Sequence, residues 1–290
     1  MDLGLGFALV AAVVWGVYLF VLKRWFEGYS PAALTVRINA FALAWYAPMV
    51  LTDRSASAAA LGGFGAAEVG IVALTVTATA LAFVLFLRAI AEGQVSYVAP
   101  INKVVPMFVL PLEVVLLGEV LGPVQVLGVL VATVAVYVAN YEPGGLFEPV
   151  RKAAASRPAQ LALVSAMCYA VSDLGKRVAL QELALPGTLW VPLLLIGVAV
   201  VLLPSAVRHP PSGVRADLPK LAAAGGIVAV GEHVTTLAFA LLPASIASPV
   251  INTQAIVAVV LGGVLLGERY FRVRLIAALL AVIGVALIAL

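Results

Sequence analysis

The sequence predicts an all-α integral membrane protein with ten transmembrane helices, arranged as two five-helix halves. Two observations lead to this fold class. Hydrophobic residues make up 64% of the 290 residues and charged residues only 11%, and a soluble fold could not bury so much apolar surface. In addition, the stretch from Ser96 to Glu119 recurs as Ser245 to Glu268 with the same internal spacing. A repeat of this length indicates that the chain is a tandem duplication.

Apolar segments follow one another along the whole chain, separated by Gly, Pro, Ser and charged residues. A helix of about twenty apolar residues crosses the ~30 Å hydrocarbon core of a bilayer. Ten segments have this length and composition, at residues 4–22, 33–51, 67–90, 95–116, 122–140, 159–178, 186–205, 218–241, 245–266 and 272–290.

The fourth and ninth segments carry the clearest part of the repeat. In each, a serine is followed four residues later by a proline, Pro100 or Pro249, and each copy ends in Val-Leu-Leu-Gly-Glu. We therefore expect a first repeat at 1–145, a polar linker at 146–158 and a second repeat at 159–290. Because five is odd, the second repeat enters the membrane from the opposite side. Such inverted repeats are typical of secondary transporters, whose sites lie near the midplane.

Charge placement predicts how the chain sits in the membrane. The connections after odd-numbered segments hold twelve Lys and Arg residues and the other connections three, so the positive-inside rule predicts odd connections in the cytoplasm and both termini outside. The net charge of +3 lies in short clusters beside apolar segments, which favours membrane orientation over nucleic-acid binding. We expect the first segment to be a retained helix rather than a signal peptide. The single Cys168 excludes disulfides within the chain.

Three features together are similar to a known family: five plus five segments, Trp15-Gly16 followed by Lys23, and the doubled Pro…Gly-Glu pattern of segments four and nine. With these features the chain resembles the drug/metabolite transporter superfamily in its EamA-type branch, over nearly its whole length. The resemblance implies two inverted repeats around a central cavity, alternating access, and export or exchange of small metabolites such as amino acids.

The resemblance also implies roles for individual positions. It marks Pro100 and Pro249 as helix breaks near the cavity, and Gly118-Glu119 and Gly267-Glu268 as turns at helix ends. The chain departs from the family pattern in two respects. Many relatives have cytoplasmic termini, and the second half has Tyr169-Ala170 where the first has Trp15-Gly16.

Polar side chains at membrane depth are the candidates for function, because a charge at a helix centre costs roughly 2.5–3.5 kcal/mol to insert. Lys103 suggests a carboxylate or phosphate on the substrate, and Asn252 occupies the repeat-equivalent position, so the two are expected to face each other. Roles in helix packing or in ion pairs stay open for these residues. The predicted substrate-binding residues are Lys103, Asn102, Asn252, Trp15, Tyr18, Tyr169 and Thr79.

A second set of residues is predicted to carry protons. Glu232 and His233 interrupt an apolar run, and Glu113 lies on the face of segment four that holds Asn102. A buried carboxyl or an imidazole can change its charge near neutral pH, although a neutral structural pair is an open alternative. Asp173 and Lys176 are three residues apart on one helix, and we interpret them as a salt bridge.

The function expected from these features is export or exchange of amino acids or similar zwitterions and acids, with or without proton coupling. An intramembrane enzyme or a lipid-carrier flippase acting on an anionic substrate is the alternative, but no acidic metal cluster or HExxH pattern is present in the sequence. We expect no enzyme activity, cofactor, metal or nucleic-acid partner. The expected partners are a small-molecule substrate and the lipid bilayer of the inner membrane, with the protein as monomer or homodimer.

Overall fold

The computed structural model describes residues 3–26, 28–53, 64–102, 104–117, 122–139, 155–208, 214–242, 244–265 and 271–288. In the described part of the chain all elements of regular secondary structure are helices. Its elements are α1 (Leu3–Trp25), α2 (Pro31–Thr52), α3 (Ala66–Glu92), α4 (Val95–Asn102), α5 (Pro106–Leu117), α6 (Pro123–Ala139), α8 (Arg157–Arg177), the π-helical turn η2 (Val178–Glu182), α9 (Gly187–Arg208), α10 (Val214–Leu241), α11 (Ala244–Asn252), α12 (Gln254–Leu265) and α13 (Phe271–Ile288).

The membrane is the solvent for much of this surface. Within the described residues five helices are long and apolar enough to cross a bilayer, namely α1, α2, α3, α9 and α10. Large apolar side chains are exposed on several of them, among them Leu74 at 61% and Val200 at 63%. Patches of this kind mark contact with lipid or with another apolar surface. The chain is therefore a multi-pass membrane protein.

Each of the ten predicted segments contains helix, but the fourth and the ninth contain two helices each. The predicted segment 95–116 is divided between α4 and α5, and 245–266 between α11 and α12. In the first, two regular bonds are lost together: Val104 N donates to Ile101 O, three residues earlier, at 3.4 Å, and Pro106 has no amide to donate to the carbonyl of Asn102, so α4 ends at Asn102. In the second, the amide and the hydroxyl of Thr253 both donate to Val250 O, at 3.1 and 2.7 Å, which closes a tight turn.

These breaks do not lie at the prolines themselves. Pro100 and Pro249 were expected to break their helices, yet α4 continues past Pro100 to Asn102 and α11 continues past Pro249 to Asn252. A proline removes a single hydrogen bond, to the carbonyl four residues earlier, and a helix can continue through that loss. The helix ends only a few residues later, at residues 102 and 252, where the following backbone amides donate to carbonyls three rather than four residues earlier. The side chains of both prolines lie outside the described residues.

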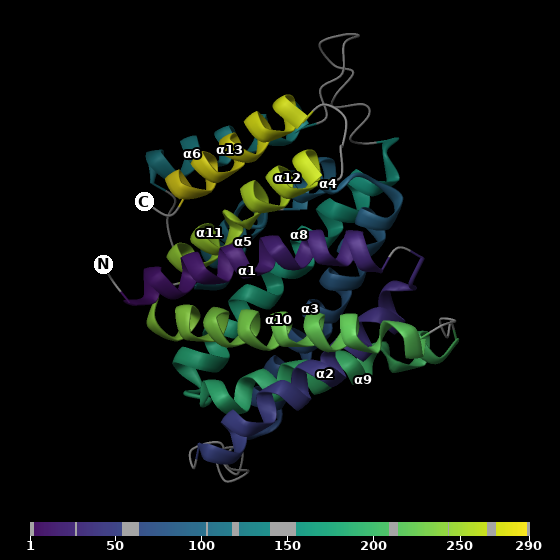
Figure 1. Ribbon diagram of the computed structural model, residues 1–290. Helices are drawn as coiled ribbons and strands as arrows, with labels where there is room; N and C mark the ends of the chain where they lie inside the picture. The colour runs from purple at the N-terminus through teal and green to yellow at the C-terminus, as the bar shows by residue number, and fades with distance from the viewer. Residues whose placement is uncertain are drawn as a thin grey trace.

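The helices pack in pairs in which one helix comes from each half of the chain. Helix α1 of the first half packs along α10 of the second, and α3 of the first packs along α8 of the second. Two further pairs join equivalent positions, α2 with α9 and α6 with α13. Figure 1 shows α1 and α10 side by side across the middle of the molecule, and α6 beside α13 at its edge.

Contacts at the helix ends show that α1 and α8 run in opposite directions. Lys23, near the end of α1, reaches Gly93 O after the end of α3 at 3.3 Å, and Arg157 at the start of α8 pairs with Glu92 of α3 at 3.2 Å. At the opposite end, Gly4 at the start of α1 packs against Leu242, which follows α10. The first helix of one half therefore starts at one end of the bundle and the first helix of the other half starts at the other end.

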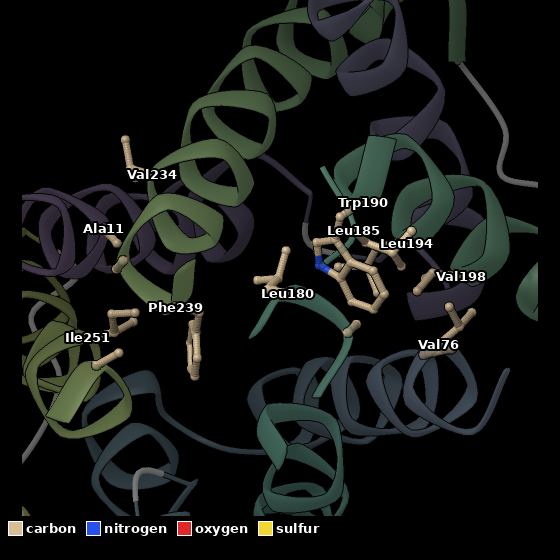
Figure 2. Close-up of a cluster of buried hydrophobic side chains, with 14 of the residues drawn as sticks. Ala11, Val76, Leu180, Leu185, Trp190, Leu194, Val198, Val234, Phe239 and Ile251 are labelled. Carbon is tan, nitrogen blue, oxygen red and sulfur yellow. The ribbon is translucent and has the colours of Figure 1, made fainter. Parts of the chain in front are cut away.

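A buried apolar cluster fills the end of the bundle where α9, α10 and η2 meet. Trp190, Leu194 and Val198 form one face of α9 and pack against Val76 of α3, as Figure 2 shows. Leu180 of the π-helical turn lies between this group and Phe239 of α10. The cluster gives the helices around the central cavity a rigid support at this end.

Candidate substrate cavity

A central cavity lies between the two halves and is lined by side chains from α1, α2, α3, α8, α9, α10, α11 and α12. Its volume is ≈ 110 Å³. A water molecule needs roughly 10–15 Å³ of such space, so the cavity has room for several waters or for a small metabolite. Six of the residues predicted from sequence line it, namely Trp15, Tyr18, Thr79, Tyr169, Glu232 and Asn252.

Aromatic rings form the part of the wall contributed by α1 and α3. Trp15 meets Tyr18 edge to face with ring centroids 5.6 Å apart, and Tyr18 stacks on Phe83 at 6.0 Å. The indole Nε1 of Trp15 donates to Thr235 Oγ1 of α10 at 2.9 Å. Tyr169, the residue of α8 aligned with Trp15, lines the same cavity. The two halves thus supply one large aromatic residue each at matching positions.

One ammonium and two carboxyl side chains share the cavity: Lys176 and Asp173 of α8, and Glu232 of α10. Lys176 is only 7% exposed. Among the described residues no hydrogen bond or salt bridge holds its ammonium, so the predicted salt bridge to Asp173 is not formed there. The charges of Lys176 and Asp173 both act on Glu232. An i, i+3 spacing allows a salt bridge but does not require it when both side chains turn toward a common space.

Asp173 belongs instead to a short polar chain that crosses to the broken helix. Ser248 Oγ of α11 donates to Asp173 Oδ2 at 2.8 Å, and Asn252 Nδ2 donates to Ser248 Oγ at 3.3 Å. Asn252 is the last residue of α11 and stands directly before the break at Thr253. The carboxylate in the cavity is therefore connected by two hydrogen bonds to the point where the helix is interrupted.

Thr79 joins the cavity wall to the contact between α3 and α8. Its hydroxyl lies 2.6 Å from Ser172 Oγ and 2.8 Å from Thr75 O. Ser165 Oγ of α8 donates to Ala82 O of α3 at 2.6 Å. The Thr79 hydroxyl is thus already engaged in the contact between α3 and α8, although Thr79 also lines the cavity.

Two predicted residues point away from the cavity. Asn102 is fully buried and donates to Ser165 Oγ at 2.8 Å and to Ala162 O at 3.2 Å, so it ties α4 to α8. His233 lies on another face of α10 from Glu232, and its Nδ1 is 3.0 Å from the hydroxyl of Tyr46 on α2. Neighbouring residues on a helix differ by about 100° in direction, which is why Glu232 and His233 do not share a site.

Other predictions fall where the structure gives no description. Lys103 lies outside the described residues, and so do the side chain of Glu113 and the Gly-Glu turns at 118–119 and 267–268. Most of the predicted linker 146–158 also lies outside them. Their expected roles stay predictions.

Sequence reasoning missed several cavity residues. Lys176 and Asp173 were assigned to each other because their spacing fits a salt bridge. Asn39 lines the cavity, is 6% exposed and donates to Leu195 O at 3.2 Å. Its signal in the sequence is a polar residue within an apolar segment. In the described residues no group of three or more His, Cys, Asp and Glu side chains is placed to hold a metal ion.

Comparisons with known proteins address the family. A model of the EamA-like transporter family matches the chain twice, at residues 2–141 and 157–290. A search of the curated proteins finds no match. Among the solved structures 22 chains match. One of them, titled only "Crystal structure of protein", superposes with a TM-score of 0.66 at 15% identity, over 99% of this chain and 95% of that one.

At that identity the solved structure supports the fold alone. The family model carries more weight, because its two matches together cover nearly the whole sequence and meet at the polar connection between the halves. This chain belongs to the EamA-like transporter family, within the drug/metabolite transporter superfamily.

Proposed function

We propose that this protein is a secondary transporter that exports or exchanges small zwitterions such as amino acids by alternating access. The observation that carries the proposal is a pair of unmatched groups in one cavity. Lys176 offers an ammonium donor that no described residue accepts. Glu232 offers a buried acceptor, Oε2, that no described residue fills. A zwitterion supplies a carboxylate for the first and an ammonium group for the second.

The charge balance of the cavity favours this substrate class over others. A wholly anionic ligand would meet Lys176 but would be repelled by Asp173 and Glu232. A purely cationic ligand would add a second positive charge beside Lys176 and would give its ammonium no acceptor, which is costly. The aromatic wall of Trp15, Tyr18 and Tyr169 offers apolar surface for the rest of the molecule.

Alternating access is supported by the arrangement of the two halves. Helices α1 and α8 run in opposite directions, the α1–α10 and α3–α8 pairs exchange the halves, and α4–α5 and α11–α12 are interrupted at corresponding places. These are the features expected of inverted repeats that rock about a central site. We therefore infer ten membrane-spanning segments in two inverted repeats, 1–145 and 159–290, joined by the linker 146–158.

Placement in the membrane follows from charge. The end of the bundle where α1 and α3 end and α8 starts carries Lys23, Arg24 and Arg157, and we infer that this end faces the cytoplasm of a cell with the protein in its inner membrane. Lys176, counted as a loop charge in the sequence, lies in the cavity. Without Lys176, the excess of Lys and Arg residues in the odd-numbered connections is larger. A monomer or a homodimer fits this arrangement.

The test is uptake and counterflow in proteoliposomes with pooled labelled amino acids, monocarboxylates and amines, comparing wild type with Lys176→Gln. Loss of a hydrogen bond to a charged group is worth about 1.5–3 kcal/mol, so the apparent affinity for a zwitterion should fall roughly 10- to 150-fold. Lys220→Gln is the matched control, because Lys220 lies on the surface with its partner Asp217.

Three outcomes would count against the proposal. Equal affinity in wild type and Lys176→Gln would mean that this ammonium does not bind substrate. A third variant, Lys103→Ala, covers the cation first predicted from sequence: if it alone loses affinity, the anionic group of the substrate binds there instead. Transport of amines but not of zwitterions would overturn the substrate class.

A further inference from the structure

A second hollow lies on the outside of the bundle, between α1, α2 and α10. We name it the outer groove and define it by its lining residues Val13, Val14, Val17, Trp45, Tyr46, Met49, Ala222, Ala223, Gly226, Ile227, Ala229, Val230 and His233. Its volume is ≈ 660 Å³, larger than that of the central cavity. All three helices that form it are among the candidate membrane spans. The groove therefore opens toward the hydrocarbon of the bilayer.

Three of the polar side-chain atoms that line the outer groove are already engaged. Trp45 Nε1 donates to Ala222 O at 2.9 Å, which ties α2 to α10. The hydroxyl of Tyr46 and Nδ1 of His233 lie 3.0 Å apart. The remaining lining residues carry no polar side-chain atoms. An occupant of this groove gains contact area and finds few hydrogen-bonding partners, which favours a hydrocarbon ligand.

The shape of the groove suits a slender, extended ligand. Its floor is made by small residues on one side of α10, Ala222, Gly226 and Ala229, and larger side chains rise beside them from α1 and α2. From Ala222 to His233 the helix rises about 16 Å at 1.5 Å per residue. This length is close to half of the ~30 Å hydrocarbon core. It corresponds to the depth of one leaflet, which is the reach of one lipid chain.

The groove is continuous with the lipid-facing surface of the protein. Residues on its rim are exposed, with Trp45 at 60%, Val13 at 54% and Val230 at 52%. We propose that a phospholipid acyl chain binds in the outer groove as a retained ligand, distinct from the freely exchanging lipid around the protein. The chain lies against Gly226 and is flanked by Trp45 and Met49 on one side and by Val13 and Val17 on the other.

This site is separate from the central cavity. Trp15 packs closely against Gly231 and, with its hydrogen bond to Thr235, forms the wall between the two spaces. Glu232 and His233 are neighbours on α10 that point about 100° apart, so Glu232 faces the cavity and His233 faces the groove. The lipid site therefore does not depend on the proposed transport function.

The experiment uses a phospholipid with a photoactivatable diazirine on its acyl chain, added to the full-length protein in detergent micelles. Crosslinked peptides are then mapped by mass spectrometry. We expect labelling concentrated at Met49, Val13 and Val230, and competed by an excess of the same phospholipid without the diazirine. The equally lipid-exposed Leu74 and Leu81 of α3 should be labelled weakly, without competition.

Gly226→Leu tests the groove directly. A Cβ at Gly226 would sit 3.5 Å from Trp45 Nε1, an ordinary contact, so the added side chain extends into the groove and should reduce its labelling at least fivefold. Gly70→Leu is the matched control, because a Cβ at Gly70 meets nothing within 4 Å and Gly70 lies on the exposed face of α3. Ala223→Leu serves as the second blocking variant if Gly226→Leu does not purify as folded protein.

Any of the following results would overturn the proposal. Labelling spread evenly over all exposed apolar positions, or unaffected by both blocking variants, would show that the groove holds no retained chain. A shift from dimer to monomer in light scattering of Gly226→Leu, without saturable labelling of the wild type, would assign the groove to a second copy of the protein. Labelling by a free fatty-acid probe but not by the phospholipid probe would reject the phospholipid as ligand.

Discussion

Lys23 and Gln181 make equivalent contacts in the two halves of the molecule. Lys23 Nζ donates to Ile90 O at 3.0 Å and to Gly93 O at 3.3 Å, at the end of α3. Gln181 Nε2 donates to Phe239 O at 2.8 Å and to Leu242 O at 2.9 Å, at the end of α10. The two pairs of carbonyls are separated by the same 149 residues as Ser96 and Ser245. A side chain at the end of the first helix of one half, or just after it in the other half, thus caps the end of that half's third helix.

Loss of either cap should destabilise the protein. The last carbonyls of a helix have no partner within the helix, and leaving such a group unsatisfied costs about 1–3 kcal/mol. We expect Lys23→Ala and Gln181→Ala each to lower the thermal unfolding temperature measured in detergent. Lys220→Ala, which removes an exposed salt bridge to Asp217, should change it much less, because exposed pairs are worth about 0–1 kcal/mol. Equal shifts in all three variants would contradict equivalent capping.

The α3–α8 contact should not tolerate a methyl group at Gly175. A Cβ there would collide with the Thr75 side chain, and overpacking of this kind costs typically about 1–3 kcal/mol. We expect Gly175→Ala to unfold at lower temperature than wild type, whereas Gly70→Ala should not. The double variant Gly175→Ala with Thr75→Ala should recover part of the loss. If it recovers nothing, the collision with Thr75 is not the cause.

Asn102 and Asn252 should behave differently although each ends the first part of a broken helix. Asn102 is fully buried and bonded to α8, so Asn102→Ala should cost about 1–3 kcal/mol of stability and leave the apparent KM for transport unchanged. Asn252 lines the cavity, so Asn252→Ala should raise the apparent KM. Transport kinetics and thermal unfolding of both variants check this contrast. A raised apparent KM in Asn102→Ala, with no change in Asn252→Ala, would instead place Asn102 in the binding site.

Glu232 should determine whether transport responds to pH. Its carboxyl lies in the cavity under the influence of Lys176 and Asp173, where binding of a proton removes one negative charge from the site. We expect a pH gradient to accelerate wild-type uptake and to leave Glu232→Gln unchanged. His233→Gln provides the comparison, because His233 faces the outer groove. Loss of the pH response in His233→Gln alone would move the proton carrier to that residue.

Helix positions could be predicted from sequence because hydrophobic length and turn residues are local signals. All ten predicted segments contain helix, and only the interruptions at Thr253 and after Asn102 required the structure. Side-chain partners are not local. Lys23 lies within α1, whereas Gln181, which makes the matching contact, lies in the π-helical turn that follows α8 and extends the chain by several residues before the cap.

The binding residues show the same limit. Trp15 and Tyr169 line the cavity as their alignment suggested. The spacing of Asp173 and Lys176 could not reveal that Ser248, 75 residues away, holds the aspartate and leaves the lysine to the cavity. Likewise, adjacency in sequence grouped Glu232 with His233, whereas the helix turns them to different spaces.

The helix pairs α3–α8 and α1–α10, each of which joins the two halves, differ in the number of polar contacts that hold them together. Across α3–α8 the described residues form the Thr79–Ser172 and Ser165–Ala82 hydrogen bonds and the Arg157–Glu92 salt bridge. Across α1–α10 they form the Trp15–Thr235 hydrogen bond beside the outer groove. If each pair must loosen to open one side of the cavity, the two open states differ in free energy, and every 1.4 kcal/mol of difference changes their ratio tenfold. Under that condition the chain has a preferred resting state, and uptake and release through the same cavity begin from unequal populations.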